Sequence, residues 1–483
     1  MFEMEVTRGE AIRSFLWKFF ERSSVQVVQF VITIILARIL LPSEYGIIAL
    51  IMVFISISQV IVDGGFNTAL IQKKQTDNVD FSTIFYFGLF MALIMYGVLY
   101  FTAPFIASYY KQPDLIPVIR VMACVLFFQS IVAVQNAYVA RNLLFRKLFI
   151  CSLVSVLLSG IVGVFMAYHG YGVWALVAQM LVSQGTLAII MWIVLGWRPQ
   201  LVFSKERLKT LLDYGWKILT ANFIVSVFVN IRKLIIGKFY SPASLAYFDR
   251  GDQIPNIIMT NIQTSVQTVM FPIFAKEQDN RIRVKQMLRR TIKMNCFIIH
   301  PLMILLILVA KPLVLLLLTE KWLPAVPFLQ IFCVANLFRP ITFPNFEAIK
   351  ALGYSNIALR LEIIKKIVDV ALLVTAVFLG IYAIAWSIVA YDFICVFINL
   401  QPCKKLLDYS IPEQVRDTIP TLLFSLLAGA IVYWIQLINM PLLLILLLQF
   451  FTGAGLYILL CFLFKEESYR YVLDIIKGRI INR

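Results

Sequence analysis

The sequence predicts an all-α integral membrane protein with about 14 transmembrane helices. Three observations carry this prediction: long apolar runs, basic residues concentrated in alternate loops, and an internal repeat. Of the 483 residues, 61% are hydrophobic and only 14% are charged. In soluble globular proteins about a quarter of the residues are charged, so this composition is typical of a membrane protein. It also leaves no room for a separate soluble domain.

The apolar runs give the number of helices. A helix needs roughly 20 apolar residues to cross about 30 Å of hydrocarbon. Runs of that kind lie at 15–39, 45–70, 81–108, 115–140, 149–168, 172–195, 213–238, 244–274, 292–318, 323–349, 356–379, 381–402, 416–437 and 440–464. The eighth run is the least apolar, because polar residues interrupt it throughout.

The basic residues give the orientation. The net charge of +17 could indicate a nucleic-acid partner, but the basic residues are scattered between apolar runs. Loops on the cytoplasmic side of a membrane carry an excess of Lys and Arg. With a cytoplasmic N-terminus, the basic segments all fall inside, and these are 73–74, 141–147, 198–209, 276–293, 404–405 and 465–483. We therefore expect an even number of spans, both termini in the cytoplasm, and no nucleic-acid partner.

The chain also repeats itself. The motif ARILLP at 37–42 corresponds to GKFYSP at 237–242, and GYGVWA at 170–175 corresponds to GIYAIA at 380–385. Spans 1–6 and 7–12 are therefore predicted to be two parallel six-helix repeats that face a central cavity, an arrangement suited to alternating access. The expected domains are a six-helix bundle at 1–195, a cytoplasmic amphipathic linker at 196–212, a second six-helix bundle at 213–402, and two additional C-terminal helices with a basic tail at 403–483.

Polar residues recur at steps of three and four within several spans, which places them on one helical face. Ionisable groups within hydrocarbon usually face a cavity or a partner. The predicted substrate-cavity residues are Arg22, Gln26 and Gln29 in span 1; Gln59, Asp63 and Asn67 in span 2; Asn222, Asn230, Arg232 and Lys233 in span 7; Asp249, Arg250, Asp252, Asn256 and Gln263 in span 8; and Arg339 in span 10.

Structural alternatives accompany these residues. Interhelical hydrogen bonds that only hold the bundle together account equally well for the amides. Pairing among Asp249, Arg250 and Asp252 is the alternative for that cluster. In span 11, a self-contained ion network is the preferred account of three residues on one face, which are Glu362, Lys366 and Asp369. Pro340 in span 10 predicts a kink or a local opening of its helix.

The chemistry of the cavity residues favours an anionic substrate. Buried cations suit a phosphate, a diphosphate or acidic sugars, while amides and aromatic rings suit sugar hydroxyls and ring faces. The sequence has no Walker-type glycine loop, which argues against ATP as the direct energy source. Its cysteines form no C-x-x-C pair and its two histidines lie far apart. We therefore expect no catalytic residues, no metal site and no cofactor apart from a coupling H⁺ or Na⁺.

Specific motifs resemble a known family. ARILLPSEYG at 37–46 with AL at 49–50, then DGGF at 63–66 with ALIQ at 69–72, resemble the first hairpin of polysaccharide-exporting flippases. IGK at 236–238 with YF at 247–248 is similar in the second half. The chain thus resembles the multidrug/oligosaccharidyl-lipid/polysaccharide exporter superfamily, in its Wzx and teichuronic-acid-exporter branch, over essentially its whole length. It departs from the branch in span 7, where Arg232 and Lys233 stand near the position of an acidic residue that is common in the branch.

The resemblance implies a function. It is the flipping of an undecaprenyl-diphosphate-linked oligosaccharide, such as an exopolysaccharide, O-antigen or teichuronic-type repeat unit, from the inner to the outer leaflet of the bacterial inner membrane, driven by an ion gradient. Its partners would be the lipid-linked oligosaccharide, membrane lipids, and the polysaccharide polymerase and export machinery. The first alternative is a multidrug or other small-molecule exporter of the same superfamily, although those typically have 12 spans and favour acidic cavities. A membrane glycosyltransferase or polymerase fits less well, because every outer loop is short. We therefore expect no enzymatic activity.

Overall fold

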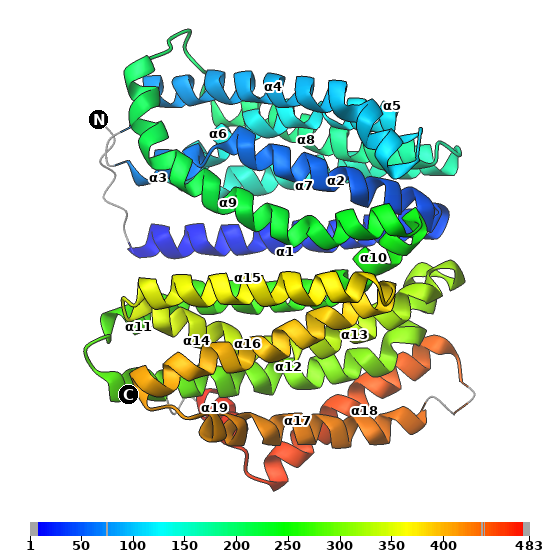
Figure 1. The fold of residues 1–483 in the computed structure, drawn as a ribbon, viewed down its shortest axis with the longest axis vertical. Coiled ribbons are helices and arrows are strands. Elements are labelled where there is room, and N and C mark those ends of the chain that lie inside the picture. Colours follow the sequence, from blue (N-terminus) through cyan, green and yellow to red (C-terminus); the bar gives the residue numbers. More distant parts are fainter. Residues whose placement is uncertain (1–7, 74–75, 436–437, 439, 477–483) are drawn as a thin grey trace. The chain divides into compact units, whose positions relative to one another are not determined.

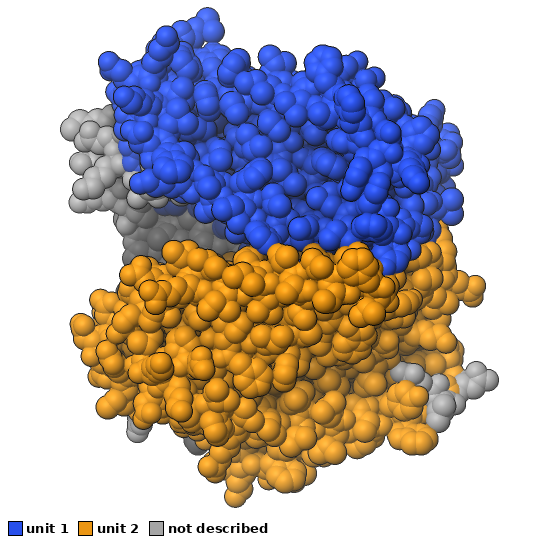
Figure 2. All heavy atoms as spheres, viewed as in Figure 1, with its two compact units in different colours: residues 1–246 blue, residues 247–483 orange. Residues whose placement is uncertain are grey.

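All regular secondary structure in the described part of the chain is helical. The computed structural model describes residues 8–73, 76–435, 438 and 440–476, and these contain no β-strand (Figure 1). The all-α fold predicted from the sequence is thereby confirmed. The chain divides into two compact units, Met1–Ala246 and Tyr247–Arg483, coloured separately in Figure 2.

In its described residues, the first unit contains nine helices and the beginning of a tenth. They are α1 (Arg8–Ile39), α2 (Pro42–Asp63), α3 (Phe66–Gln72), α4 (Asn78–Tyr110), α5 (Leu115–Met122), α6 (Val125–Arg141), α7 (Phe145–Tyr168), α8 (Val173–Leu195) and α9 (Lys205–Phe239). Helix α7 packs against α1 and α8, whereas α9 packs against α2, α3 and α4. The close approach of α1 and α7 depends on Gly160, because a Cβ at this position would lie 2.3 Å from Ile32 Cδ1.

The second unit is organised around the long helix α12 (Arg281–Leu318). The other elements are α10 (Pro242–Ser265), which begins in the first unit, then a π-helical turn (Val266–Met270), α11 (Phe271–Lys276), a 3₁₀ turn (Glu320–Ala325), α13 (Val326–Asn336), α14 (Arg339–Ala351), α15 (Ser355–Val377), α16 (Ile381–Leu407), α17 (Ile411–Trp434), α18 (Leu442–Leu463) and α19 (Glu467–Ile476). Helix α12 contacts α13, α14, α17 and α18, and α15 packs on α16.

The predicted count of 14 spans is not confirmed. Among the described residues, 11 helices are long and apolar enough to cross a membrane, or 12 if a bent pair counts as one span. The bent pair is Glu320–Asn336 with Arg339–Ala351, which meet at 43° directly before Pro340. The two predicted spans that fall short are helical but too polar. They are α10, with its row of polar residues from 249 to 263, and α15, which carries Glu362, Lys365, Lys366 and Asp369.

Two features of the repeat have the same local structure in both copies. The chain leaves α1 and α9 through short extended breaks, after which Pro42 and Pro242 begin α2 and α10. Proline favours the first turn of a helix because the missing N–H would have no intrahelical acceptor there. Likewise α8 and α16 begin after Gly172 and Gly380, whose φ angles are +55° and +114°. Glycine adopts such positive φ angles without the steric cost that a side chain would add.

The predicted span 45–70 is interrupted near its end. Gly64 and Gly65 have φ angles of +53° and +73°, so the helix ends at Asp63 and α3 begins at Phe66. The bare backbone also allows α9 to approach, because a Cβ on Gly65 would lie 2.7 Å from the carbonyl oxygen of Gly215. The sequence prediction treated the run as one helix because its apolar character continues through the break.

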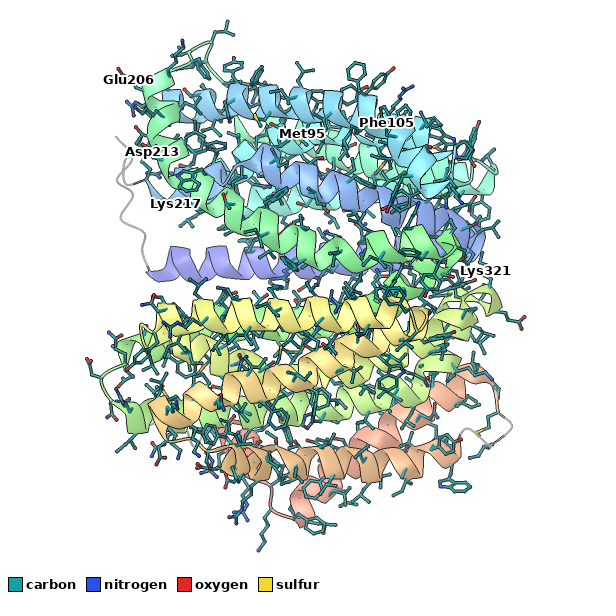
Figure 3. All side chains as sticks on the ribbon, viewed as in Figure 1. Met95, Phe105, Glu206, Asp213, Lys217 and Lys321 are labelled. Atoms are coloured by element: carbon teal, nitrogen blue, oxygen red, sulfur yellow. The ribbon has the colours of Figure 1, made fainter. Side chains whose placement is uncertain are left out.

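The segment between the predicted domains is also divided differently in the structure. Residues 205–239 form one continuous helix, so the second half of the predicted linker at 196–212 belongs to the same helix as span 7. Ser204 caps this helix by accepting a hydrogen bond from the backbone N–H of Arg207. Figure 3 labels Glu206, Asp213 and Lys217 along the first half of α9. No proline interrupts residues 205–239, which explains why the helix continues.

Candidate functional site

The polar faces of spans 2 and 7 meet inside the first unit. On α2, Gln59 Nε2 donates to Asp63 Oδ1 at 2.8 Å. On α9, Asn230 Nδ2 donates to Ser56 Oγ of α2 at 3.3 Å and to the carbonyl of Ser226 at 2.9 Å. Residues separated by 174 positions in the chain are thus joined by a hydrogen bond between span 2 of the first predicted repeat and span 7, the first span of the second predicted repeat.

The polar residues of α1 lie apart from this cluster. Arg22, Gln26 and Gln29 are all exposed, and α1 packs mainly against α7. One turn earlier, Lys18 Nζ forms an ion pair with Glu21 at 2.8 Å. These three predicted cavity residues therefore present a polar face that the other helices of their own unit leave uncovered.

Asn67 and Asn222, two further predicted cavity residues, do not lie beside the others on the polar faces of spans 2 and 7. Asn67 is partly exposed on α3, beyond the Gly64–Gly65 break, so it does not continue the face of Gln59 and Asp63 on one helix. Asn222 is exposed on α9, two turns before Asn230. Arg232 and Lys233 lie two and three residues after Asn230 and are both partly buried.

In the second unit, the predicted cavity residues of span 8 lie on α10. Arg250 donates to Gln253 Oε1 at 2.5 Å, and its guanidinium lies 5.8 Å from the centre of the Trp322 ring. Asn256 is exposed and accepts a hydrogen bond from Thr260 Oγ1 at 3.2 Å. The other predicted members, Asp249, Asp252 and Gln263, are partly buried.

Arg339 forms an ion pair within its own bundle. Its Nε lies 2.9 Å from Oδ2 of Asp392 on α16, and Asp392 is only 6% exposed. Asp392 is not among the predicted cavity residues, although an acidic residue within the apolar run at 381–402 was the available signal. A guanidinium held by a buried carboxylate has a structural role that the cavity prediction did not include.

Span 11 contains an ion pair in addition to the predicted network of Glu362, Lys366 and Asp369. Glu362 pairs with Lys365, which is mostly buried. A spacing of three residues brings the two side chains to neighbouring positions on the helix surface.

A buried carboxylate that the sequence analysis missed anchors the start of α9. Asp80 is fully buried and lies 2.7 Å from Lys73 Nζ and 3.3 Å from Arg207 Nη1. Arg207 also reaches Asp77 at 3.1 Å. Burial raises the pKa of Asp77, but the hydrogen bond from the backbone of Asp80 and the nearby charges of Arg207 and Lys73 outweigh it, so the pKa is lowered overall.

A second missed network joins α12 to the C-terminal helices. Arg289 Nε and Nη2 each lie 2.7 Å from the carboxylate of Asp417, which is 5% exposed. Lys293 Nζ bridges Asp417 at 3.0 Å and Glu467 at 2.7 Å. The hydrogen bond from Lys293 lowers the pKa of Glu467. These residues come from three separate segments, so no local pattern relates them.

Within the ranges that the structure describes, no group of three or more His, Cys, Asp and Glu side chains lies close enough together to hold a metal ion.

Comparison with known proteins decides the family. A family described as polysaccharide biosynthesis protein matches residues 35–327, which is more than half of the chain. The chain belongs to this family. The match includes the motifs at 37–50, 63–72 and 236–248, so the resemblance to polysaccharide exporters found in the sequence is confirmed.

Curated relatives of this polysaccharide biosynthesis protein are moderately similar. The teichuronic acid biosynthesis protein TuaB of Bacillus subtilis (strain 168) is 26% identical over 304 residues, which cover 62% of this chain and 63% of TuaB. The succinoglycan biosynthesis transport protein ExoT of Rhizobium meliloti (strain 1021) is 24% identical over 321 residues, which cover 66% of this chain and 65% of ExoT. The match therefore spans slightly less than two thirds of either relative.

The fold also matches a solved transporter. The lipid II flippase MurJ, in an inward closed conformation, superposes with a TM-score of 0.75 and covers 96% of this chain and 100% of MurJ. The identity is only 15%, so this likeness establishes the fold alone. Together with the apolar helices, it makes this polysaccharide biosynthesis protein a multi-pass membrane protein with a transporter fold.

Proposed function

We propose that this protein flips an undecaprenyl-diphosphate-linked oligosaccharide from the cytoplasmic to the outer leaflet of the bacterial inner membrane. The observation that carries the proposal is the fold of a lipid flippase in a chain whose family is defined by polysaccharide biosynthesis. Support also comes from the two relatives, whose names refer to teichuronic acid biosynthesis and to succinoglycan transport.

The polar faces supply suitable chemistry for such a substrate. Amides such as Gln59 and Asn230 both donate and accept hydrogen bonds, as sugar hydroxyls require. Arginines such as Arg22 and Arg250 can bind a diphosphate with two N–H groups at once. A site that uses both kinds of side chain would hold the charged head and the sugars, while the prenyl tail stays in lipid.

The remaining features of the mechanism follow from the sequence. We propose alternating access through the predicted central cavity, driven by a gradient of H⁺ or Na⁺, with both termini in the cytoplasm. The basic loops support this orientation. The polysaccharide polymerase and the export machinery are the expected protein partners, because the flipped unit must next be polymerised. We propose a transporter without catalytic activity of its own.

Reconstitution tests this function directly. The purified full-length protein is placed in liposomes with a fluorescent undecaprenyl-diphosphate oligosaccharide, and the fraction reached by a membrane-impermeant quencher is followed over time. Protein-dependent exchange between the leaflets is expected, and it should be lost in Arg22→Ala, Arg232→Ala and Arg250→Ala. Arg283→Ala is the matched control, because this arginine is 61% exposed and lies on α12, away from the polar faces.

The outcomes separate the alternatives. Wild-type exchange by all three cavity variants would remove the anion-cavity hypothesis while leaving flipping itself intact. If no exchange occurs with or without H⁺ and Na⁺ gradients, the flippase proposal fails and small-molecule export becomes the better hypothesis. Export of cationic dyes by the same liposomes would then support that alternative.

A further inference from the structure

One face of α12 changes from basic to apolar within a single helical turn. Five of its residues line a cavity of about 280 Å³ that α19 completes, and these are Gln286, Arg289, Arg290, Lys293 and Met294. One turn farther along, Phe297 begins the lining of a second cavity of about 480 Å³, which α17, α18 and α19 complete. Both cavities lie within the second unit and share two helices.

The basic cavity is built from side chains held in place. Asp417 orients Arg289 through two hydrogen bonds of 2.7 Å and contacts Lys293 at 3.0 Å. The guanidinium of Arg290 lies 3.3 Å from the centre of the Tyr471 ring. Arg289 also lies 3.8 Å from Glu413, which pairs with Lys285 at 2.9 Å. Within the described residues, this cluster holds four cations, Lys285, Arg289, Arg290 and Lys293, and three carboxylates, Glu413, Asp417 and Glu467. One positive charge is therefore in excess.

The carboxylate of Glu467 is the replaceable part of this cavity. It lies 2.7 Å from Lys293 Nζ, yet its side chain is 73% exposed, whereas that of Asp417 is 3% exposed. An exposed anion that contacts a mostly buried lysine can exchange with another anion at small cost, because it rehydrates when it leaves. A phosphate fits this exchange, since Lys and Arg bind phosphate oxygens through strong charge-assisted hydrogen bonds.

The second cavity is suited to a hydrocarbon chain. It owes its space to small residues on α17 and α18, among them Ala428, Gly429, Gly453 and Ala454, and large apolar side chains such as Phe297 and Phe450 line the rest. Spread over the roughly 15 Å of one leaflet, its volume has a cross-section of about 30 Å². With carbon–carbon contacts of about 4 Å, this is the room for one chain.

We infer that the two cavities together bind one anionic phospholipid, with its phosphate among Arg289, Arg290 and Lys293 and one acyl chain beside Phe297. Basic pockets between transmembrane helices on the cytoplasmic side are typical sites for anionic lipid head groups. The order of the cavities along α12 matches the order of head group and chain in a lipid. Such a lipid links α12 to the C-terminal helices, and this inference does not depend on the proposed transport function.

Lipid selectivity tests the inference. The purified full-length protein in detergent is titrated with phosphatidylglycerol, phosphatidylcholine or undecaprenyl phosphate and followed by native mass spectrometry. Phosphatidylglycerol should bind more tightly than phosphatidylcholine. Arg290→Gln should weaken its binding about fivefold, the effect of one cation near a lipid head group. Arg283→Gln, on the same helix but outside the cavity, should leave it unchanged.

Two further variants test each part separately. Glu467→Gln should strengthen phosphatidylglycerol binding, because the phosphate no longer competes with a carboxylate for Lys293. Ala454→Trp should fill the apolar cavity and abolish binding of all lipids at this site, with folding checked by gel filtration. If the Ala454→Trp protein aggregates, Arg290→Gln and Glu467→Gln decide the test, because the first should weaken phosphatidylglycerol binding and the second should strengthen it.

Three results would overturn the inference. Equal affinity for phosphatidylglycerol and phosphatidylcholine would exclude a phosphate-selective site. Identical binding by Arg290→Gln and Arg283→Gln would place the lipid elsewhere. Displacement of phosphatidylglycerol by an equimolar amount of undecaprenyl phosphate would make the tail of a transported lipid the occupant instead.

Discussion

The buried carboxylate of Asp80 should contribute more to stability than either of its cationic partners. Asp80 is fully buried and serves as the counter-ion for both Lys73 and Arg207. Asp80→Asn keeps the shape of the side chain but leaves two cations without this charge. Arg207→Gln leaves Asp80 with Lys73 at 2.7 Å.

The expected magnitudes follow from burial. Removing one partner of a buried ion pair costs about 3–5 kcal/mol. The side chains of Lys73 and Arg207 are 25% and 42% exposed, so both cations regain part of their hydration. We therefore expect Asp80→Asn to lower the free energy of unfolding by about 2 kcal/mol. Arg207→Gln should lower it by less than about 1 kcal/mol, the value of a largely exposed pair.

Unfolding of the full-length protein in mixed micelles by increasing SDS, followed by circular dichroism, measures both values. Asp114→Asn is the control, because this aspartate is exposed and its side chain caps no helix. Protease cleavage in the connection at 196–204 should also become faster in Asp80→Asn, since Arg207 lies in the first turn of α9. The reasoning is refuted if Arg207→Gln destabilises the protein as much as Asp80→Asn does.

Three more predictions follow from single contacts. Gly46→Ala should reduce the folded yield strongly, because its Cβ would lie 1.7 Å from the carbonyl oxygen of Pro242; Gly97→Ala, with no atom within 4 Å of its Cβ, should not. Arg339→Gln should cost about 3 kcal/mol in SDS unfolding, and adding Asp392→Asn should recover most of it. The hydrogen bond from Lys293 lowers the pKa of Glu467 in the folded protein. The contact therefore stabilises α19 fully at pH values above the ordinary pKa of a glutamate, and this stabilisation is lost as the pH falls through the lowered pKa of Glu467. Proteolysis of α19 should therefore accelerate only in acid, and in Glu467→Gln it should be fast at every pH.

Much of the local structure could be predicted from the sequence. Within the described residues, each of the predicted apolar runs is mostly helical, and the helix starts at Pro42 and Pro242 and directly after Gly172 and Gly380 are readable from residue type. The count of 14 spans is unconfirmed because α10 and α15 combine helical periodicity with too many polar residues. The double glycine at 64–65 was visible as a sequence signal, but its effect on the position of Asn67 required the backbone angles.

The candidate site was predictable only in part. Helical spacing correctly placed Gln59 and Asp63 within hydrogen-bonding reach, because their separation of four residues is one helical turn. The same spacing gave no partner for Arg339, since Asp392 lies 53 positions away on another helix. The buried pair of His300 with Thr421 at 2.9 Å was missed for the same reason.

By itself, the sequence determined the helical fold class, the membrane environment and the family, because each depends on local composition, on short motifs or on a repeat within one chain. Only the tertiary structure decided which polar residues meet, as Asn230 meets Ser56 and Lys293 meets Glu467. The physical reason is that helical periodicity specifies the face on which a side chain lies, whereas the neighbour of that face depends on how separate helices pack. A polar residue within a membrane span must find a partner, but its own sequence neighbourhood does not say which helix supplies it.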